Sequence, residues 1–371
     1  MPDANSEYSV RQWVVLEYPL PCELPARRGE NALATQRRSA PTIADVAALA
    51  GVSKGTVSKA LNGRGQLRHS TRERVRAAAE RLDFRPNALA QALLEGRTYT
   101  VGVLTTDSFG RFTIPMMLGI EDALGAGKIS TLLCDGRDDP LREQHYVRTL
   151  LSRRVDGIVV TGRRRDPRPP IGDLAIPVVY AYVESGNPED LSILSDDEQG
   201  GALAVNHLLR TGRTKVAHVT GPERHLSARL REAGARAALQ GTCDDFAGGG
   251  TLWGKWSEAW GRDAAQILLR SGDPFDAVFC GSDQIGRGVG DALREAGRRV
   301  PDDVALVGFD NWDVMTEASR PPLTTVDPNL TELGQLAARK LLQAIDGEPL
   351  EERRVLQRCD LVIRQSTGTA S

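Results

Sequence analysis

The chain has 371 residues, which is too long for one ordinary domain and indicates two or three. It is 40% hydrophobic and 26% charged, and no run approaches the ~20 apolar residues needed to cross a bilayer. The N-terminus has no basic stretch followed by an apolar core, and the five cysteines are scattered without a CxxC pair. We therefore expect a cytoplasmic protein with reduced thiols, not a secreted or membrane-spanning one.

Charge is distributed unevenly along the chain. The formal net charge is −2, but residues 42–97 hold ten Lys and Arg against five Asp and Glu. Residues 98–371 carry the compensating acidic excess. A basic segment joined to an acidic body is typical of a nucleic-acid-binding protein with a separate second function.

Residues 1–40 combine mixed charge with no hydrophobic periodicity. We expect a disordered extension, or a start codon assigned too far upstream. The segment Thr42–Leu61 then predicts two short helices joined by a tight turn. Thr42 and Asp45 have the spacing of a capping box, Gly51 permits the turn, and Ser53 can cap the second helix. This pattern is typical of a helix-turn-helix, although a plain helical hairpin in a globular core shares it.

The second helix carries short hydroxyls and cations on its polar positions, which suit phosphates and base edges. A third helix is predicted to begin at Ser70, with Glu73 as its capping-box partner, and to end near Leu82. The three helices would form a head over residues 41–86.

Three stretches resemble the lactose/galactose-repressor family of bacterial transcription regulators. They are TIADVAALAGVSKGTVSKALN at Thr42–Asn62, STRERV at Ser70–Val75 and RPNALAQALLEGRT at Arg85–Thr98. The resemblance extends from residue 41 to 367. It implies an all-α helix-turn-helix head and an α/β two-lobed periplasmic-binding-protein-like body with two doubly wound parallel sheets. The DNA contacts that it implies are Thr42, Ser53, Lys54, Gly55, Thr56, Ser58, Lys59, Asn62, Asn87 and Leu93.

In that family, the segment matching residues 87–98 is a hinge that folds on the operator. Its leucine enters the minor groove and kinks the duplex, and Leu93 holds that position here. The alternative is an ordinary linker whose leucines pack on the body.

From Val101 onward, short β-rich runs alternate with helical stretches over residues 99–371. The expected strands are 101–104, 130–134, 157–160, 177–181, 216–221, 277–281 and 304–310. Two such sets predict two parallel-sheet lobes with a ligand cleft beyond the carboxyl ends of the strands. The last segments, residues 323–345 and 359–367, are expected to cross back to the first lobe and then return.

Polar residues follow several expected strands, and the resemblance adds Arg231 and the aromatic Trp256. Tyr182 stands where some members of the family have an aspartate. The predicted effector-binding set is Asp107, Tyr182, Arg231, Trp256, Ser282 and Asp310. Aromatic faces and a cation suit a ring that carries hydroxyl groups, which indicates a carbohydrate. The alternatives are a surface role for Arg231, a helix cap for Asp310 and lobe packing for Trp256.

Enzyme motifs do not emerge from the sequence. GAGKIS at Gly125–Ser130 resembles a P-loop only superficially, and HExxH and GxSxG are absent. We expect no catalytic residue, metal site or cofactor. The preferred hypothesis is a homodimeric repressor that binds double-stranded operator DNA and a small-molecule effector. The alternatives are a two-lobed binding protein without direct DNA regulation and a sugar-processing enzyme. Inducer and corepressor action are opposite signs of one linkage, and the sequence is compatible with both.

Overall fold

The computed structural model describes residues 41–61, 65–84, 96–108, 110–125, 129–240 and 245–368. The chain divides into two compact units, one ending at Pro86 and the other beginning at Asn87. In the described ranges, no helix combines the length and apolar character that a membrane crossing requires.

The described part of the first unit contains three helices, α1 (Ile43–Ala50), α2 (Lys54–Leu61) and α3 (His69–Arg81). Each helix contributes one valine with no exposed surface, namely Val46, Val57 and Val75. Small alanines surround these three valines, so the helices approach closely around a core of modest volume. The predicted apolar periodicity of the head is confirmed.

The turns of the head follow the predicted local chemistry, except at α3. The Thr42–Asp45 capping box is present, Gly51 adopts φ +63°, and Ser53 Oγ accepts from the backbone N–H of Thr56 at 3.2 Å. The prediction that α3 begins at Ser70 is wrong, because the N-cap is Arg68 and no side chain caps it. The Arg68 carbonyl already accepts from the third and fourth following N–H groups, which places Ser70 inside the first turn.

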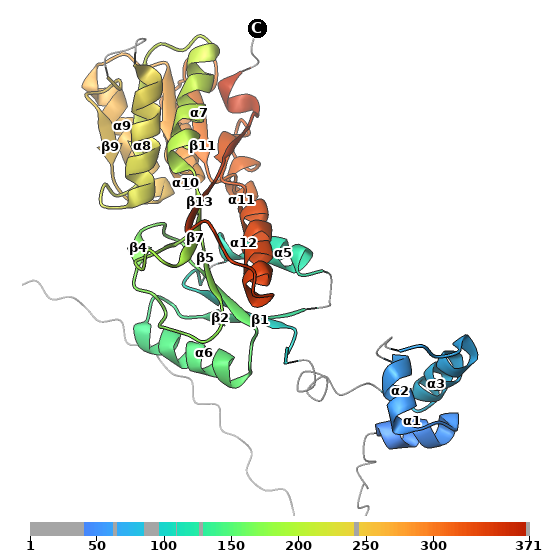
Figure 1. Ribbon diagram of the computed structural model, residues 1–371. Coiled ribbons are helices and arrows are strands. Elements are labelled where there is room, and N and C mark those ends of the chain that lie inside the picture. Colours follow the sequence, from blue (N-terminus) through green and yellow to red (C-terminus); the bar gives the residue numbers. More distant parts are fainter. Residues whose placement is uncertain are drawn as a thin grey trace, which may run out of the picture. The chain divides into compact units, whose positions relative to one another are not determined.

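Among its described residues, the second unit contains two six-stranded sheets, one in each lobe (Figure 1). The first sheet has the order β13 (Arg354–Gln357), β7 (Leu191–Ser195), β5 (Val178–Ala181), β3 (Gly157–Thr161), β1 (Thr100–Thr105), β2 (Ser130–Asp135). The second sheet has the order β14 (Asp360–Val362), β12 (Thr324–Asp327), β11 (Ala305–Phe309), β10 (Ala277–Cys280), β8 (Val216–Thr220), β9 (Thr251–Trp253). All pairings are parallel except β12 with β14. A small parallel pair, β4 (Pro167–Arg168) with β6 (Glu184–Ser185), lies beside the first sheet.

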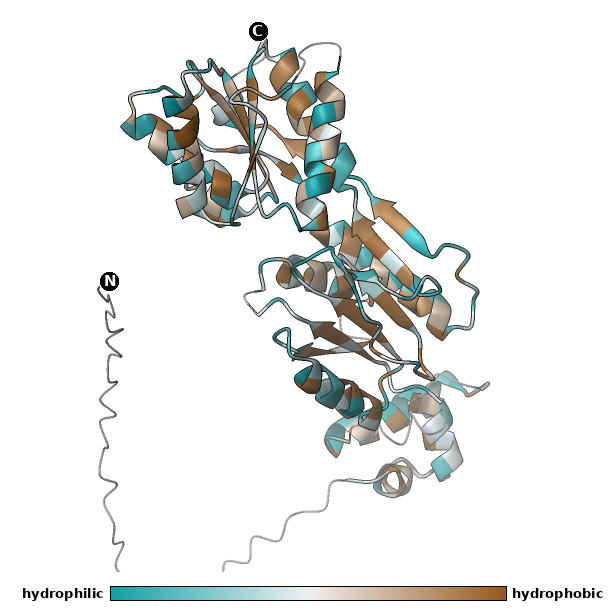
Figure 2. Cartoon of the chain, turned by 90° about the vertical axis from the view of Figure 1, so that its left-hand side faces the viewer, coloured by the Kyte–Doolittle hydropathy of each residue, from teal (hydrophilic) through white to brown (hydrophobic). Residues whose placement is uncertain are grey.

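Helices cover both faces of each sheet, and the strands are mostly apolar (Figure 2). The first sheet packs between α6 (Pro140–Ser152) on one face and the pair α5 (Thr113–Ala123) and α12 (Leu330–Ile345) on the other. The second packs between α7 (Asp197–Arg210) with α8 (Leu226–Leu239) and α9 (Glu258–Ser271) with α10 (Asp283–Glu295). A short helix, α11 (Asp313–Thr316), and a 3-10 turn (Gln365–Thr367) complete the second lobe. Successive side chains along β1 and β3 point to opposite faces of the first sheet and are buried on both. This is the pattern expected of a parallel sheet that helices cover on both faces.

Three helix pairs make their contacts through reciprocal glycines. A Cβ built on Gly201 of α7 would lie 2.1 Å from the Arg231 carbonyl oxygen of α8, and one on Gly234 would lie 1.7 Å from that of Glu198. The pairs α5 with α12 and α9 with α10 are built in the same way. Because only glycine permits this backbone approach, Gly201 fixes how deeply Arg231 sits in the lobe.

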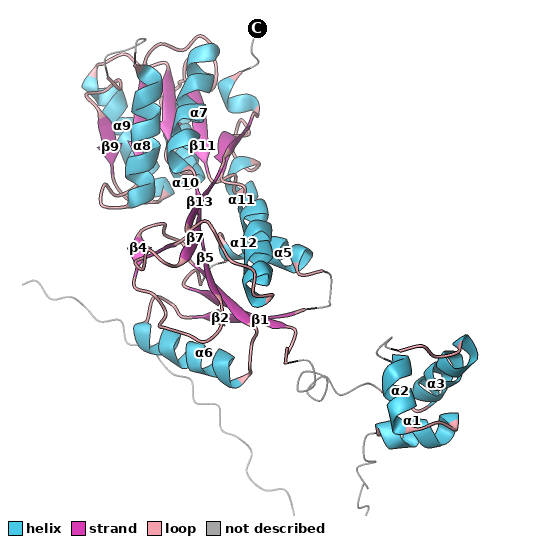
Figure 3. Ribbon diagram, viewed as in Figure 1, coloured by secondary structure: helices cyan, strands magenta, loops and turns pink. Residues whose placement is uncertain are grey.

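The chain passes between the lobes three times (Figure 3). It leaves the first sheet after β7, returns through α12 and β13, and ends in the second sheet with β14. The predicted return of the last segments is therefore confirmed. Strands β4, β6, β7, β9, β12, β13 and β14 were not among the predicted strands, because polar residues interrupt their apolar pattern and several of them have only two or three residues.

Candidate functional site

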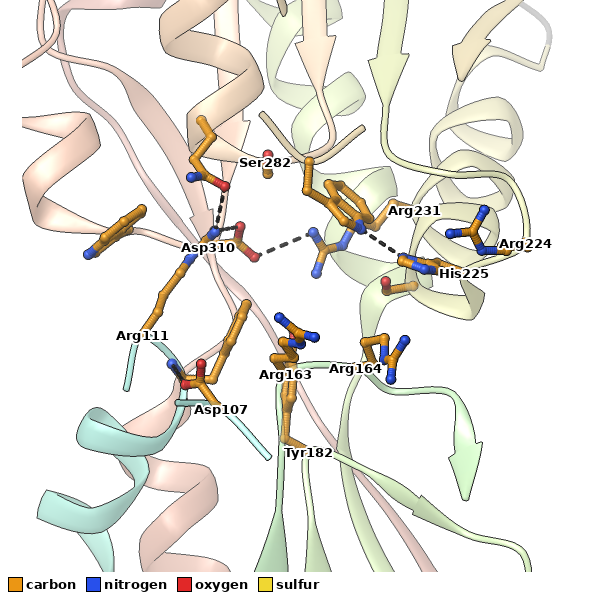
Figure 4. Close-up of a pocket in the computed structure, with 15 residues that line it drawn as sticks. Asp107, Arg111, Arg163, Arg164, Tyr182, Arg224, His225, Arg231, Ser282 and Asp310 are labelled. Carbon is orange, nitrogen blue, oxygen red and sulfur yellow. Dashed lines mark hydrogen bonds and ion pairs between the residues drawn. The ribbon is translucent and has the colours of Figure 1, made fainter. Parts of the chain in front are cut away.

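A cavity of about 730 Å³ lies between the two lobes, at the carboxyl ends of the strands (Figure 4). Its volume is within the range of small-molecule sites. The six residues predicted as effector contacts all line it: Asp107, Tyr182, Arg231, Trp256, Ser282 and Asp310. The other lining residues were not predicted and are Arg111, Phe112, Arg163, Arg164, Arg224, His225, Ser227, Gln284 and Trp312.

Arg231 lies on α8 and is only 2% exposed. Its Nε donates to Asp197 at 2.8 Å, and its Nη1 donates to the carbonyl of Gly281 at 2.6 Å and to Asp310 at 3.4 Å. The guanidinium carbon lies 3.6 Å from the ring centre of Phe309. The surface interpretation of Arg231 is therefore wrong, since the side chain is buried and ion-paired.

Asp310 is shared between arginines of the two lobes. It bonds Arg231 from the second lobe and Arg111 from the loop that precedes α5 in the first lobe. The guanidinium of Arg111 also lies 4.8 Å from the ring centre of Trp312 and donates to Gln284 at 3.1 Å. The interpretation of Asp310 as a helix cap is wrong, because Trp312 is the N-cap of α11.

Asp197 provides the second buried carboxylate of this network. It has no exposed surface and also accepts from Arg165 Nη1, across the lobes, at 2.9 Å. Sequence reasoning missed Arg165 and Asp197. An arginine run such as residues 163–165 carries no local signal that its third member is buried.

Asp107 and Ser282 hold helix N-termini at the cavity. Asp107 accepts from the N–H groups of Phe112 at 2.8 Å and Thr113 at 3.1 Å, and Ser282 Oγ accepts from Ile285 N–H at 3.4 Å. The starts of α5 and α10 therefore face the cavity, where their partial positive charge favours negatively charged or hydroxyl oxygens.

Aromatic side chains provide the apolar part of the lining. Tyr182 is 2% exposed and stacks on Phe112 at a centroid distance of 4.9 Å. Tyr182 and Asp310 adopt φ of +67° and +106°, conformations that non-glycine residues avoid and that concentrate at functional sites. Trp256 packs against the core of the second lobe, which confirms the packing role, and it also lines the cavity, where its stacking on a ligand stays a prediction.

A hydrogen bond between Trp256 and His225 fixes the protonation of the histidine. Trp256 Nε1 donates to His225 Nδ1 at 2.8 Å. An indole N–H can only donate, so Nδ1 is an acceptor and the neutral ring carries its proton on Nε2. Burial lowers the pKa of His225, which keeps this neutral form at physiological pH.

Arginines from both lobes also lie at the entrance of the cavity. Arg163 and Arg164 follow β3, and Arg224 precedes α8. A second cavity of about 420 Å³ adjoins the first and shares Arg164, Arg224 and His225 with it. Among the described residues, no group of three or more His, Cys, Asp or Glu side chains is arranged to hold a metal ion.

In the head, the described members of the predicted DNA-contact set are Thr42 and six residues between Ser53 and Lys59. Lys54, Gly55 and Lys59 are exposed on α2, and neither lysine forms an ion pair with a described residue. Ser53 Oγ lies 2.9 Å from Thr56 Oγ1, and Thr42 Oγ1 donates to Asp45 at 2.7 Å, so these hydroxyls also stabilise the helix starts. Ser58 is half-buried on the same helix. Asn62, Asn87 and Leu93 lie outside the described residues, as do residues 1–40.

Comparison with known families gives two matches. Residues 42–87 match the bacterial regulatory proteins of the lacI family, and residues 205–367 match the periplasmic binding protein-like domain. The first segment coincides with the helical head. The second covers most of the second lobe, together with α12 and β13 of the first lobe.

Individual relatives cover almost the whole chain. It is 34% identical over 340 residues to the HTH-type transcriptional regulator CelR of Thermobifida fusca, covering 89% of this chain and 99% of that protein. It is 33% identical over 319 residues to the ribose operon repressor of Escherichia coli K12, covering 85% and 96%. Both are named as regulators of transcription and not as enzymes.

Solved structures give the same result. The fold is similar to that of a lac repressor dimer bound to operator and the anti-inducer ONPF, with a TM-score of 0.72, 29% identity, and coverage of 89% and 99% of the two chains. A CelR–cellobiose complex is similar with a TM-score of 0.61, 30% identity, and coverage of 88% and 99%. With its helix-turn-helix head and two-lobed body, this chain belongs to the lacI family of DNA-binding transcriptional regulators.

Proposed function

We propose that this protein is a homodimeric repressor that binds double-stranded operator DNA through α2 and responds to a carbohydrate bound between its lobes. The observation that carries the proposal is the cavity itself, in which aromatic faces and hydrogen-bonding groups from both lobes converge. Similarity to a protein whose structure contains cellobiose supports a carbohydrate as the ligand class.

On the DNA side, the proposed contacts divide into two kinds. Lys54 and Lys59 contact phosphates or base edges, since both ammonium groups are exposed on one helix. The N-terminal turns at Thr42 and Ser53 present backbone N–H groups to phosphates. Gly55, Thr56, Ser58, Asn62 and Asn87 complete the proposed interface, and Leu93 is the proposed wedge in the minor groove.

On the effector side, the proposed set keeps its six predicted members. Tyr182 offers a hydroxyl that makes no hydrogen bond with the described residues, and Arg231 has a third nitrogen, Nη2, with no acceptor among them. Trp256 and Phe112 offer faces to the apolar side of a ring. Asp107, Ser282 and Asp310 are held in place by helix starts and ion pairs, so the polar contacts are preorganised.

The coupling between effector and DNA uses the contacts that bridge the lobes. They are Arg111 with Asp310 and Gln284, Arg165 with Asp197, and Asp166 Oδ1, which accepts from Leu226 N–H at 2.8 Å. A ligand that touches both lobes changes the balance between these contacts. Such a change shifts DNA affinity by about 1–3 kcal/mol through the segment at residues 87–98.

For dimerisation, we assign an exposed apolar stripe on α5 to the interface between two copies. Ile114 and Leu118 are one helical turn apart and are 58% and 56% exposed. The similar lac repressor structure is a dimer. In sedimentation experiments, Leu118→Glu is expected to give a monomer, and a dimer of unchanged stability would remove α5 from the interface.

The main experiment is a gel shift of the full chain with the DNA upstream of its own gene, with and without candidate sugars. We expect a specific complex whose affinity a bound sugar changes, and the direction of the change identifies inducer or corepressor action. Leu93→Ala should weaken this complex and leave effector affinity unchanged. Effector binding without any DNA complex would favour a two-lobed binding protein that does not regulate DNA directly.

A further inference from the structure

We infer that the effector carries an anionic group, a phosphate or a carboxylate, held where the main cavity meets the second, smaller one. The inference rests on the proposed function and specifies its ligand class. The recognised molecule is then an acidic or phosphorylated compound with a hydroxylated ring, and not a neutral sugar.

The charge of the cavity lining is the first observation. Five arginines line the main cavity against two carboxylates, Asp107 and Asp310. Asp310 is saturated by Arg111 and Arg231, and one oxygen of Asp107 is occupied by backbone N–H groups. The charges in the interior of the main cavity therefore balance one another. The excess positive charge of its lining lies on the three arginines at the entrance, Arg163, Arg164 and Arg224.

The partners of these three arginines are the second observation. Arg163 and Arg164 both bond the same oxygen of Asp138, at 2.9 Å and 3.2 Å, so a single carboxylate serves two guanidinium groups. Arg224 forms no ion pair with any residue in the described part of the chain. The two lobes thus present cations to each other across the junction, as Figure 4 shows for Arg164 and Arg224.

Carboxylates line the second cavity and lower the positive charge on that side, so the anion is expected beside Arg164 and Arg224 on the side of the main cavity. Only Glu143 is neutralised by an arginine of its own, whereas Asp139 and Asp166 accept backbone N–H groups and keep their negative charge. Asp139 caps α6 by accepting from Leu141 N–H at 2.9 Å, and Glu143 pairs with Arg168. Asp166 accepts from Leu226 N–H at 2.8 Å. The neutral His225, with its proton on Nε2, adds one more donor at the same place.

The chemistry of these groups favours an oxyanion. Guanidinium forks match the paired oxygens of phosphates and carboxylates, and charge-assisted hydrogen bonds are about twice as strong as neutral ones. The side chains of Arg163 and Arg164 are 47% and 49% exposed, so a ligand reaches them from solvent. An anionic group between Arg164 and Arg224 would contact both lobes and stabilise the arrangement in which they face each other.

The first test uses inorganic phosphate as the probe and the thermal unfolding of the full chain as the readout. Phosphate is expected to raise the melting temperature above that in chloride of matched ionic strength. The variant Arg164→Gln/Arg224→Gln should lose this increase. The matched control, Arg148→Gln/Arg339→Gln, removes two exposed arginines that line neither cavity and should retain it. Equal responses of all three proteins to phosphate, or no response of the wild type, would overturn the inference.

The second test compares paired ligands by calorimetry: glucose with glucose 6-phosphate and glucuronate, and ribose with ribose 5-phosphate. At least one anionic member should bind roughly tenfold or more tightly than its neutral partner, and the double variant should abolish the difference. A phosphate or a carboxylate preference separates the two sources of the anion. If a neutral sugar changes operator binding while no anionic member binds more tightly, the proposed function stands and this inference fails.

Discussion

The head and the body of this protein use cationic side chains in opposite ways. On α2, Lys54 and Lys59 are exposed and form no ion pairs within the described chain. At the base of the cavity, Arg231 and Arg165 are almost fully buried and share the carboxylate of Asp197. The first arrangement leaves charge available to a polyanion in water, whereas the second uses charge to fix the relative position of structural elements.

The difference shows where stability and binding are separable. Exposed cations contribute little to folding and supply salt-dependent affinity for DNA. A buried pair contributes little net stability as a whole, but loss of one partner leaves an uncompensated charge in a medium of low dielectric constant. Substitutions of the exposed cations in the head should therefore change binding alone, and substitutions of the buried charges at the cavity should change folding first.

Asp197→Ala tests the buried side of this comparison and should have the largest effect. Two buried guanidinium groups lose their shared acceptor, so the free energy of unfolding should fall by about 3–5 kcal/mol in urea denaturation. The exposed Asp273→Ala is the control and should stay within about 0.5 kcal/mol of the wild type. A loss below about 1 kcal/mol for Asp197→Ala would show that the network is well hydrated.

Lys54→Ala and Lys59→Ala test the exposed side. Each should reduce operator affinity, and the slope of the logarithm of affinity against the logarithm of salt concentration should fall by about 1 for each phosphate that the variant no longer neutralises. The unfolding curve should be unchanged. Lys215→Ala, an exposed lysine of the body, is the control. An unchanged salt slope in both head variants would assign DNA binding to another surface.

Asp283 allows a pH test of the buried charges. It has no exposed surface, and burial together with the nearby charge of Asp310 raises its pKa to about 8 from an ordinary 3.8. Between these values the folded state holds a proton that the unfolded state has released. The contribution of Asp283 to the free energy of unfolding is therefore fully present below about pH 4, and it is lost as the pH rises through about 8.

Relative to Asp283→Asn, the wild type should lose up to about 1.4 kcal/mol of stability per pH unit within this window. Urea denaturation at a series of pH values measures the difference. Parallel pH profiles for the two proteins would mean that Asp283 is ionised in the folded state.

Tyr182→Phe should have the smallest effect and separates binding from folding inside the cavity. The substitution keeps the stack on Phe112 and removes only a hydroxyl that makes no hydrogen bond with the described residues. Effector affinity should fall by about 0.5–1.5 kcal/mol in calorimetry, with the melting temperature unchanged. A large loss of stability would instead assign the hydroxyl to the fold.

The structural elements of the head could be predicted because local chemistry specifies them. The capping box at Thr42, the positive φ of Gly51 and the cap at Ser53 each involve residues within a few positions of one another. The start of α3 was misplaced by the same reasoning, because Ser70 and Glu73 have capping-box spacing but Arg68 already closes the first turn. Spacing shows that a cap is possible, and the backbone hydrogen bonds decide which residue provides it.

In the body, too, some features of the site could be predicted from the sequence and others could not. Alternating apolar runs and the rule that ligands bind beyond parallel strand ends were sufficient to place Asp107, Ser282 and Asp310 at one cavity. Arg111, Arg165 and Asp197 could not be found, since their partners lie in the opposite lobe and up to 199 residues away in sequence. The sequence alone determined most of the strands, the two lobes and the starts of α1 and α2, because these depend on short-range hydrogen bonds and periodic burial. Only the tertiary structure decided which charges are buried together, because desolvation and long-range pairing depend on how the lobes meet.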